Sequence, residues 1–228
     1  MSLGAILLCA GRGERLGAEV PKALVPLAGR PLFAWSLEAL ERTPAIERIV
    51  VVGPARLLRE TLATAGLAAP KVVAWAEGGR ERQHSVARGL AALPPECDRV
   101  LVHDSARALA APELIGRVIG DALLHGAAIA AVALEDTLKR SSLQRIEATV
   151  PRAGLWRAQT PQVFRRDWLE AAHAAAGGGA VATDDAALVE ALGHPVWLTP
   201  GEALNFKITT RQDLDLAEAW LARTTTRT

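Results

Sequence analysis

Short apolar runs alternate with longer amphipathic segments along the first half of the chain. The runs have the length and the branched side chains of strands, and they lie at 4–8, 49–52, 71–75, 99–103 and 128–132. The amphipathic segments between them predict helices over 31–42, 54–66, 82–93 and 112–124. This alternation predicts an α/β fold: a Rossmann-like, mostly parallel sheet with helices on both faces. Its ligand crevice should lie at the carboxyl ends of the strands.

The alternation is interrupted over residues 134–160. Residues 136–150 resemble two polar strands around a turn at Ser141-Ser142, and such a hairpin has too little apolar surface to be stable alone. We interpret it as a protruding arm that packs on a second subunit; a lone surface hairpin is the alternative. Beyond it, the pattern predicts helices over 165–175, 184–191 and 211–222 and a strand over 195–198.

Composition narrows the class of protein. The chain has 228 residues, half of them hydrophobic, which suits a single domain spanning 1–228 with the arm as an appendage. The net charge is +1, so no global field attracts nucleic acid or an anionic membrane, and no apolar run is long enough for a membrane span. Cys9 and Cys97 form no disulfide framework, which favours a reducing cytoplasm.

The first strand is followed by a glycine loop, residues 9–17, with Pro21-Lys22 shortly after. The spacing of Gly11, Gly13 and Gly17 fits neither the P-loop nor the dinucleotide motif. Glycines allow backbone N–H groups to approach a phosphate, and Arg15 with Lys22 could reach a triphosphate. An ordinary glycine-rich turn with solvated charges is the alternative.

Two further segments fall at the same predicted edge. Gly78-Gly79 follows the third strand and precedes a helix, where backbone N–H groups could meet a nucleotide, although such a pair can also be a simple turn. Asp104 ends the fourth strand, and a single carboxylate of this kind suits Mg²⁺ bridging substrate phosphates. Alternatively Asp104 caps the next turn; its neighbour His103 is interpreted as a core imidazole.

The second half of the chain adds a cation and two threonines. Lys207 follows Asn205 and Phe206 in what reads as a short strand, and it could meet a second phosphate. Thr160 and Thr183 could equally be helix caps or turn formers. The sequence shows no nucleophilic triad. A phosphate monoester is already anionic at neutral pH, so cations and alignment would suffice for its transfer chemistry.

Taken in order, these motifs resemble the 2-C-methyl-D-erythritol 4-phosphate cytidylyltransferase family from Ala5 to about Leu216. The matching segments are Ala10-Gly11-x-Gly13-x-Arg15-Leu16, Pro21-Lys22, Gly78-Gly79-x-x-Arg82-x-x-Ser85-Val86, His103-Asp104-x-Ala106-Arg107, Asp136-Thr137-x-Lys139, Gln159-Thr160-Pro161-Gln162, Thr183-Asp184-Asp185 and Asn205-x-Lys207-Ile208-Thr209. Together these segments are specific, whereas each alone is weak.

The resemblance implies a nucleotidyltransferase-type fold, a homodimer and a role for each matching residue. Arg15 and Lys22 would stabilise charge on the α-phosphate and the pyrophosphate. The CTP-binding residues would be Ala10, Gly11, Gly13, Gly78, Gly79, Arg82, Ser85 and Ser105, and Asp104 would hold Mg²⁺. The residues positioning methylerythritol phosphate would be Arg152 and Lys207 with Thr137, Thr160 and Thr183. Arg152 and Thr137 would reach over from the partner on the arm.

Three positions depart from the family pattern: Ser105 replaces a common Ala, Ala108 a common Pro, and Cys9 a frequent small residue. None of these changes removes a charged group. Two alternatives remain open. A cytidylyltransferase for another polyol phosphate, such as ribitol 5-phosphate, would carry the same CTP motifs. A non-catalytic nucleotide-binding module is disfavoured because the charged residues of the motifs are all retained.

Overall fold

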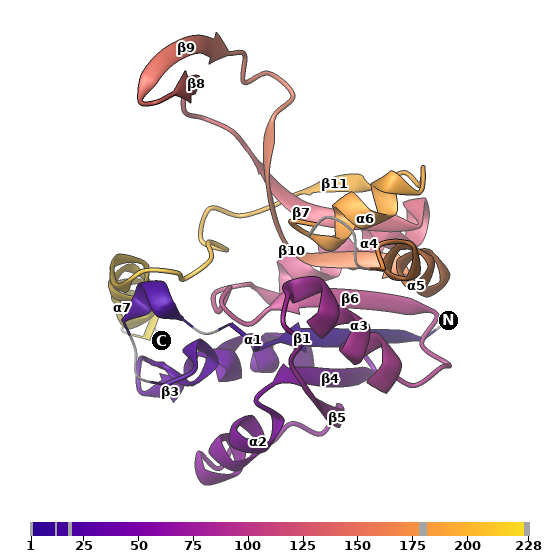
Figure 1. The fold of residues 1–228 in the computed structure, drawn as a ribbon. Helices are drawn as coiled ribbons and strands as arrows, with labels where there is room; N and C mark the ends of the chain where they lie inside the picture. Colours follow the sequence, from indigo (N-terminus) through magenta and orange to yellow (C-terminus); the bar gives the residue numbers. More distant parts are fainter. Residues whose placement is uncertain (1, 12, 18–19, 178–181, 226–228) are drawn as a thin grey trace.

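The computed structural model describes residues 2–11, 13–17, 20–177 and 182–225. Its core is a seven-stranded sheet with the order β11-β7-β10-β6-β1-β4-β5 (Figure 1). The strands are β1 Leu3–Leu8, β4 Arg48–Gly53, β5 Val72–Glu77, β6 Arg99–Asp104, β7 Ala127–Ala133, β10 Trp156–Arg165 and β11 Trp197–Pro200. Adjacent strands of this sheet are parallel except at β10, which runs antiparallel to both of its neighbours. The predicted α/β class with a mostly parallel sheet is confirmed.

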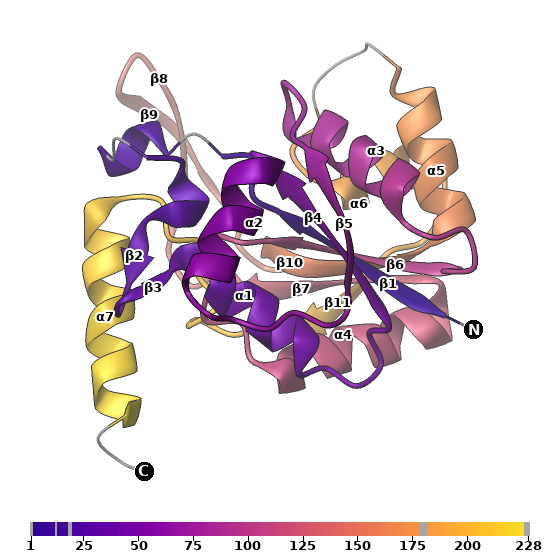
Figure 2. The same cartoon turned by 90° about the horizontal axis from the view of Figure 1, so that it is seen from below.

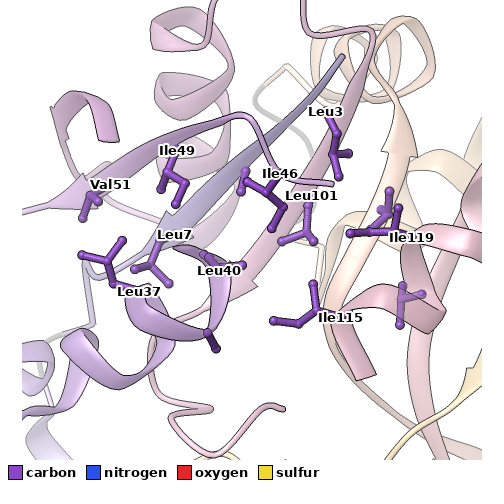
Figure 3. Packing of buried hydrophobic residues seen from close by; sticks show 14 of the residues in the cluster. Leu3, Leu7, Leu37, Leu40, Ile46, Ile49, Val51, Leu101, Ile115 and Ile119 are labelled. Atoms are coloured by element: carbon purple, nitrogen blue, oxygen red, sulfur yellow. The ribbon is translucent and has the colours of Figure 1, made fainter. Parts of the chain in front are cut away.

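Helices cover both faces of this sheet (Figure 2). Buried residues of α1 (Leu32–Glu41), α2 (Ala55–Thr64) and α4 (Pro112–His125) form one core layer with one face. Residues of α3 (Arg82–Ala92), α5 (Arg166–Ala175) and α6 (Asp185–Ala191) form the layer on the other face. Figure 3 shows the first layer, in which α1 and α4 pack on the sheet through Leu37, Leu40, Ile115 and Ile119.

A smaller cluster lies beside the sheet. It joins α7 (Arg211–Thr225) to the short strand β2 (Pro26–Leu27), which pairs with β3 (Arg30–Pro31), and it has Leu27, Leu32 and Leu214 in its interior. One short 3-10 helix, Glu14–Leu16, lies within the glycine loop, and a second, Lys22–Leu24, follows it. Within the part of the chain that the structure describes, no helix combines the length and apolarity needed to cross a bilayer.

The arm projects away from the body as a two-stranded sheet of β8 (Leu138–Ser142) and β9 (Arg145–Val150) (Figure 1). The predicted turn at Ser141-Ser142 is wrong, since both serines lie in β8. The turn is at Leu143-Gln144, whose φ angles of 47° and 67° are left-handed. The predicted range 134–160 also includes five residues of β10, so the protruding part ends before Trp156.

The prediction missed β10 as a strand. Six of its positions pair with β7, but the register shifts between Ala158 and Gln162, across Pro161. Proline cannot donate to a sheet ladder, so it argues against a central strand unless a bulge accommodates it. This strand supplies one wall of the site described next.

Candidate active site

The site lies at the edge of the sheet where the parallel strands β1, β4 and β6 end. The register pairs Leu8 of β1 with Asp104 of β6 and with Val52 of β4. Because these strands are parallel, the glycine loop after β1 and the carboxylate of Asp104 emerge at the same edge of the sheet. The predicted convergence of these two features is confirmed.

Glycines allow the loops at this edge to approach one another. A Cβ on Gly78 would lie 2.5 Å from the Cβ of Ala10, so a side chain there would push the two loops apart. Gly13 has φ +76°, and a Cβ on it would lie 2.9 Å from the Cβ of Lys22. The amide N–H of Lys22 donates to the carbonyl of Gly11 at 3.3 Å, which closes the loop. The glycines therefore fix where the cations stand.

Three cavities adjoin at this edge and share Lys207. The first, of about 350 Å³, is lined by residues that include Ala10, Gly11, Lys22, Gly79, Arg82, Ser85, Asp104 and Ser105. The second, of about 210 Å³, is lined by residues that include Arg82, Asp104, Arg107, Thr160, Gln162, Thr183 and Asp184. The third, of about 460 Å³, is lined by Gly11, Gly13, Glu14, Arg15, Lys22, Lys207 and Thr209. Such polar, adjoining cavities suit two anionic ligands held side by side.

Asp104 is bound by two cations. Its Oδ1 accepts a hydrogen bond from Nε of Arg82 at 3.3 Å, and its Oδ2 accepts one from Nζ of Lys207 at 2.7 Å. Burial would raise the pKa of Asp104, but the charges of Arg82 and Lys207 lower it well below its usual value. The carboxylate is therefore ionised, and it contacts these cations instead of capping the following turn.

Lys22 lies in a cluster of positive charge. Burial, and then the charge of Lys207, lower the pKa of Lys22 to about 8, although Asp104 acts in the opposite direction. An ammonium group in this position is destabilised until an anion arrives. The cluster is thus poised to attract phosphates.

This pKa predicts an alkaline loss of activity. The ammonium form of Lys22 is complete well below pH 8 and is lost as the pH rises through about 8. We therefore expect kcat/KM for the anionic nucleotide to fall about tenfold per pH unit above that point. In Lys22→Arg the fall should disappear, because a guanidinium stays charged. Steady-state pH profiles of both proteins test this, and coinciding alkaline limbs would contradict it.

Backbone contacts help to place the remaining residues that were predicted to bind the nucleotide. Ser85 accepts a hydrogen bond from the N–H of Gly79 at 3.0 Å, which ties the second loop to α3. Gly78 does not line the first cavity but packs behind Ala10. Ser105 is buried at the cavity wall. The structure thus brings together the predicted residues of both loops, while their roles stay predictions.

The predicted acceptor residues divide into two groups. Thr160, Thr183 and Lys207 line the second cavity, whereas Thr137 and Arg152 are exposed on or beside the arm and line none of the three cavities. Neither Thr160 nor Thr183 caps a helix, because Thr160 lies in β10 and the cap of α6 is Asp184. The oxygen of Thr160 accepts the N–H of Asp104 at 3.0 Å and lies 3.1 Å from Nδ1 of His103.

The structure corrects the predicted setting of Lys207 and adds a detail to that of His103. Lys207 is not in a strand: it lies in an extended segment held by a hydrogen bond from the N–H of Ile208 to the carbonyl of Ala106 at 2.8 Å. His103 is a core imidazole, as predicted, and burial lowers its pKa to about 4, so the ring is neutral. Its Nε2, however, has no hydrogen-bond partner among the described residues.

Sequence reasoning gave no role to Arg107, Gln162 or Asp184, which all line the second cavity. The guanidinium of Arg107 donates to the carbonyl of Asn205 at 2.6 Å, and Gln162 donates to Asp184 at 2.8 Å. Each lies within a segment that matched the family pattern. Their position in those motifs could have indicated a functional role, but it gave no information about which residues they contact.

Glycine loops, clustered cations and the ionised carboxylate of Asp104 meet at the carboxyl edge of this Rossmann-like sheet. That arrangement is typical of a nucleotidyltransferase. The family model described as "IspD: 2-C-methyl-D-erythritol 4-phosphate cytidylyltransferase" matches residues 3–223. The chain therefore belongs to the 2-C-methyl-D-erythritol 4-phosphate cytidylyltransferase family.

Individual relatives agree along nearly the whole length. A protein of Gloeobacter violaceus named 2-C-methyl-D-erythritol 4-phosphate cytidylyltransferase is 48% identical over 95% of this chain and 94% of its own length. The crystal structure of the protein of that name from Thermus thermophilus is 39% identical, with a TM-score of 0.79, covering 98% of this chain and 100% of that one. A structure titled 4-diphosphocytidyl-2C-methyl-D-erythritol synthase from Anaerococcus prevotii gives a TM-score of 0.83 at 28% identity, covering 97% of this chain and 99% of that one.

Proposed function

We propose that this protein transfers the cytidylyl group of CTP to 2-C-methyl-D-erythritol 4-phosphate. The products are 4-diphosphocytidyl-2-C-methyl-D-erythritol and pyrophosphate. The observation that carries the proposal is the junction of three cavities at Lys207, with Lys22 and Asp104 on its walls, in a chain that matches the family over residues 3–223. CTP would take the first and third cavities, and the acceptor the second.

The bond changes need no proton transfer to activate the nucleophile. An oxygen of the acceptor's phosphate monoester attacks the α-phosphorus of CTP, and the bond from that phosphorus to the bridging β-oxygen breaks. Pyrophosphate leaves with the electron pair. Because the attacking oxygen is already anionic at neutral pH, the enzyme's task is to align two polyanions and neutralise their charge.

Cations from separate elements would share that task. Arg15 lies in the glycine loop and Lys22 follows it, and both line the third cavity, where the β- and γ-phosphates would lie. Lys207 faces all three cavities, so it would meet the acceptor phosphate near the α-phosphate. Fixed cations of this kind stabilise the transition state because they need no reorganisation as charge shifts.

Asp104 would hold the magnesium ion. It lines the first and second cavities, where a carboxylate can share Mg²⁺ with substrate phosphates. Burial alone would raise the pKa of Asp104, but Arg82 and Lys207 lower it, so the carboxylate is ionised, as a metal ligand must be. When bound, Mg²⁺ would neutralise phosphate charge.

A homodimer through the arm is part of the proposal. Among the described residues, β8 and β9 pair only with each other, and Leu143 and Ile146 near the turn are 99% and 62% exposed. A second copy of the chain would cover these side chains and would bring Arg152 and Thr137 to a neighbouring acceptor cavity. The cytoplasmic location stays a prediction.

Mixing two inactive variants tests the arm's role. Lys22→Ala removes a cation of the body and Arg152→Ala one of the arm. The two variants are mixed in equal amounts so that their subunits exchange at random. About half of the dimers then contain one subunit of each kind. If each arm acts on the neighbouring subunit, such a dimer has one intact site of two, so the mixture should recover about one quarter of the wild-type activity. Activity after mixing, with sedimentation to verify dimers, measures this. No recovery, or a monomeric wild type at micromolar concentration, would contradict the arrangement.

The acceptor is tested directly by substrate comparison. The purified protein is incubated with CTP and Mg²⁺ and with either 2-C-methyl-D-erythritol 4-phosphate or ribitol 5-phosphate, and pyrophosphate release is followed. We expect rapid release with the first acceptor and little with the second. Exclusive use of ribitol 5-phosphate would overturn the acceptor assignment, and CTP binding without release for either acceptor would favour a non-catalytic module.

A further inference from the structure

Asp185 is a buried carboxylate that lies between two basic side chains. It is the first residue of α6, and its exposed fraction is 0%. Its Oδ2 accepts a hydrogen bond from Nη1 of Arg82 at 2.6 Å, and its Oδ1 lies 3.0 Å from Nε2 of His173. Since an ionised carboxylate only accepts hydrogen bonds, Nε2 of His173 carries the proton. A carboxylate buried so completely is tolerated only because it is paired in this way.

The contacts of Arg82 leave one nitrogen for a ligand. Nη1 is bound to Asp185 and Nε to Asp104, so the plane of the guanidinium is fixed at two points. Nη2 is buried and has no hydrogen-bond partner among the described residues. Arg82 lines both the first and the second cavity. An unpaired buried donor is costly unless a ligand completes it, and a cavity anion would do so.

The start of α6 is itself anchored to the sheet. Asp184 caps the helix by accepting the N–H of Ala187 at 3.0 Å, and its other oxygen accepts the side-chain amide of Gln162 in β10 at 2.8 Å. β10 pairs with β6, which ends in Asp104. Asp104 and Asp185, the two carboxylates that hold Arg82, are therefore fixed to the same part of the sheet. Asp104 ends β6, whereas Asp185 lies on α6.

We propose that Asp185 is a positioning residue that orients Arg82 so that Nη2 faces the phosphates of CTP, with His173 holding Asp185 in turn. The inference rests on the proposed function, in that CTP occupies the first cavity. Without Asp185, Asp104 would be the remaining carboxylate on Arg82. The guanidinium would turn toward Oδ1 of Asp104 and away from the nucleotide, while Lys207 keeps its bond to Oδ2. The defect should therefore fall on CTP and not on the acceptor.

Calorimetric titration with Mg-CTP tests the proposal on the intact protein. We expect Asp185→Asn to raise the Kd for CTP about tenfold, because the charge that holds Arg82 is lost. His173→Leu should weaken binding less, whereas His173→Gln, which keeps a donor, should bind nearly as the wild type does. The KM for the acceptor should change little in all three. Asp167→Asn, an exposed carboxylate on α5 paired with Arg165, is the matched control and should leave CTP binding unchanged.

A double-mutant cycle separates positioning from a merely structural role. If Asp185 acts through Arg82, then Asp185→Asn should cost nothing further in an Arg82→Ala background. Additive losses, or wild-type CTP affinity in folded Asp185→Asn, would overturn the inference. Should Asp185→Asn fold poorly, a His173→Leu protein with wild-type CTP affinity would overturn it equally. A wild-type protein that binds no CTP would instead refute the proposed function on which the inference rests.

Discussion

Replacing Lys22 by alanine is expected to lower kcat by roughly a thousandfold, the loss typical of removing a strong transition-state charge. Lys22 lines the first and third cavities, and its pKa is lowered to about 8, first by burial and then by Lys207. The site thus makes the ammonium less stable before the nucleotide binds, and bound phosphates reverse that effect. Because the charge on the leaving pyrophosphate grows as the bond breaks, the loss should appear in kcat more than in KM for CTP.

The control for this variant is Lys71→Ala. Lys71 precedes β5, and its Nζ donates to the carbonyl of Thr43, away from the three cavities. Single-turnover measurements at saturating CTP, with circular dichroism to verify folding, compare the two proteins. Turnover of folded Lys22→Ala near that of Lys71→Ala would exclude the role given to Lys22.

The second large effect is expected for Lys207→Met, which keeps an unbranched side chain but removes the charge. The ammonium of Lys207 reaches Oδ2 of Asp104 and faces the second cavity, where the acceptor phosphate would lie. We expect kcat/KM for the acceptor to fall about a hundredfold or more. Asp104 keeps Arg82 as a partner, so the fold should survive the change.

The pattern of the loss distinguishes Lys207 from a general structural residue. CTP affinity, measured by calorimetry, should fall far less than the acceptor's kcat/KM, because Lys22 and the glycine loop remain. Lys207→Arg should recover only part of the activity, since a planar guanidinium does not replace a compact ammonium at a crowded junction. Equal losses for CTP and for the acceptor would show that Lys207 does not act chiefly on the acceptor phosphate.

The position of the site at the carboxyl edge of the sheet could be predicted from the sequence, because each feature that marks it is local in the chain. A run such as 4–8 is apolar throughout, as befits a strand buried on both faces, and the glycines that follow must leave it at its carboxyl end. Asp104 ends another such run. Parallel pairing then brings the two together without any knowledge of distant contacts.

The features that were missed depend on tertiary contacts. β10 carries Pro161 and several polar residues, and it is a central strand because β6 and β7 pair with it on either side. The turn of the arm uses Leu143 and Gln144 in left-handed conformations. The prediction placed the turn at the preceding serines, because serine is the more usual turn residue. Lys207 is held by the hydrogen bond of Ile208 to Ala106.

The contacts within the site were also beyond the reach of sequence patterns. Arg82 and Asp185 are far apart in the chain and meet because α3 and α6 cover the same face of the sheet. Motif spacing indicated that both residues belong to the family's pattern, but it could not reveal that one orients the other.

The central claim is that the acceptor's phosphate oxygen attacks the α-phosphorus of CTP. Phosphorus NMR of a completed reaction with Mg²⁺, CTP and 2-C-methyl-D-erythritol 4-phosphate tests it most directly. The account predicts that the triphosphate and monoester resonances are replaced by inorganic pyrophosphate and two coupled doublets of an unsymmetrical diphosphate diester. Unchanged CTP and monoester signals, or CMP and pyrophosphate without the coupled doublets, would contradict it.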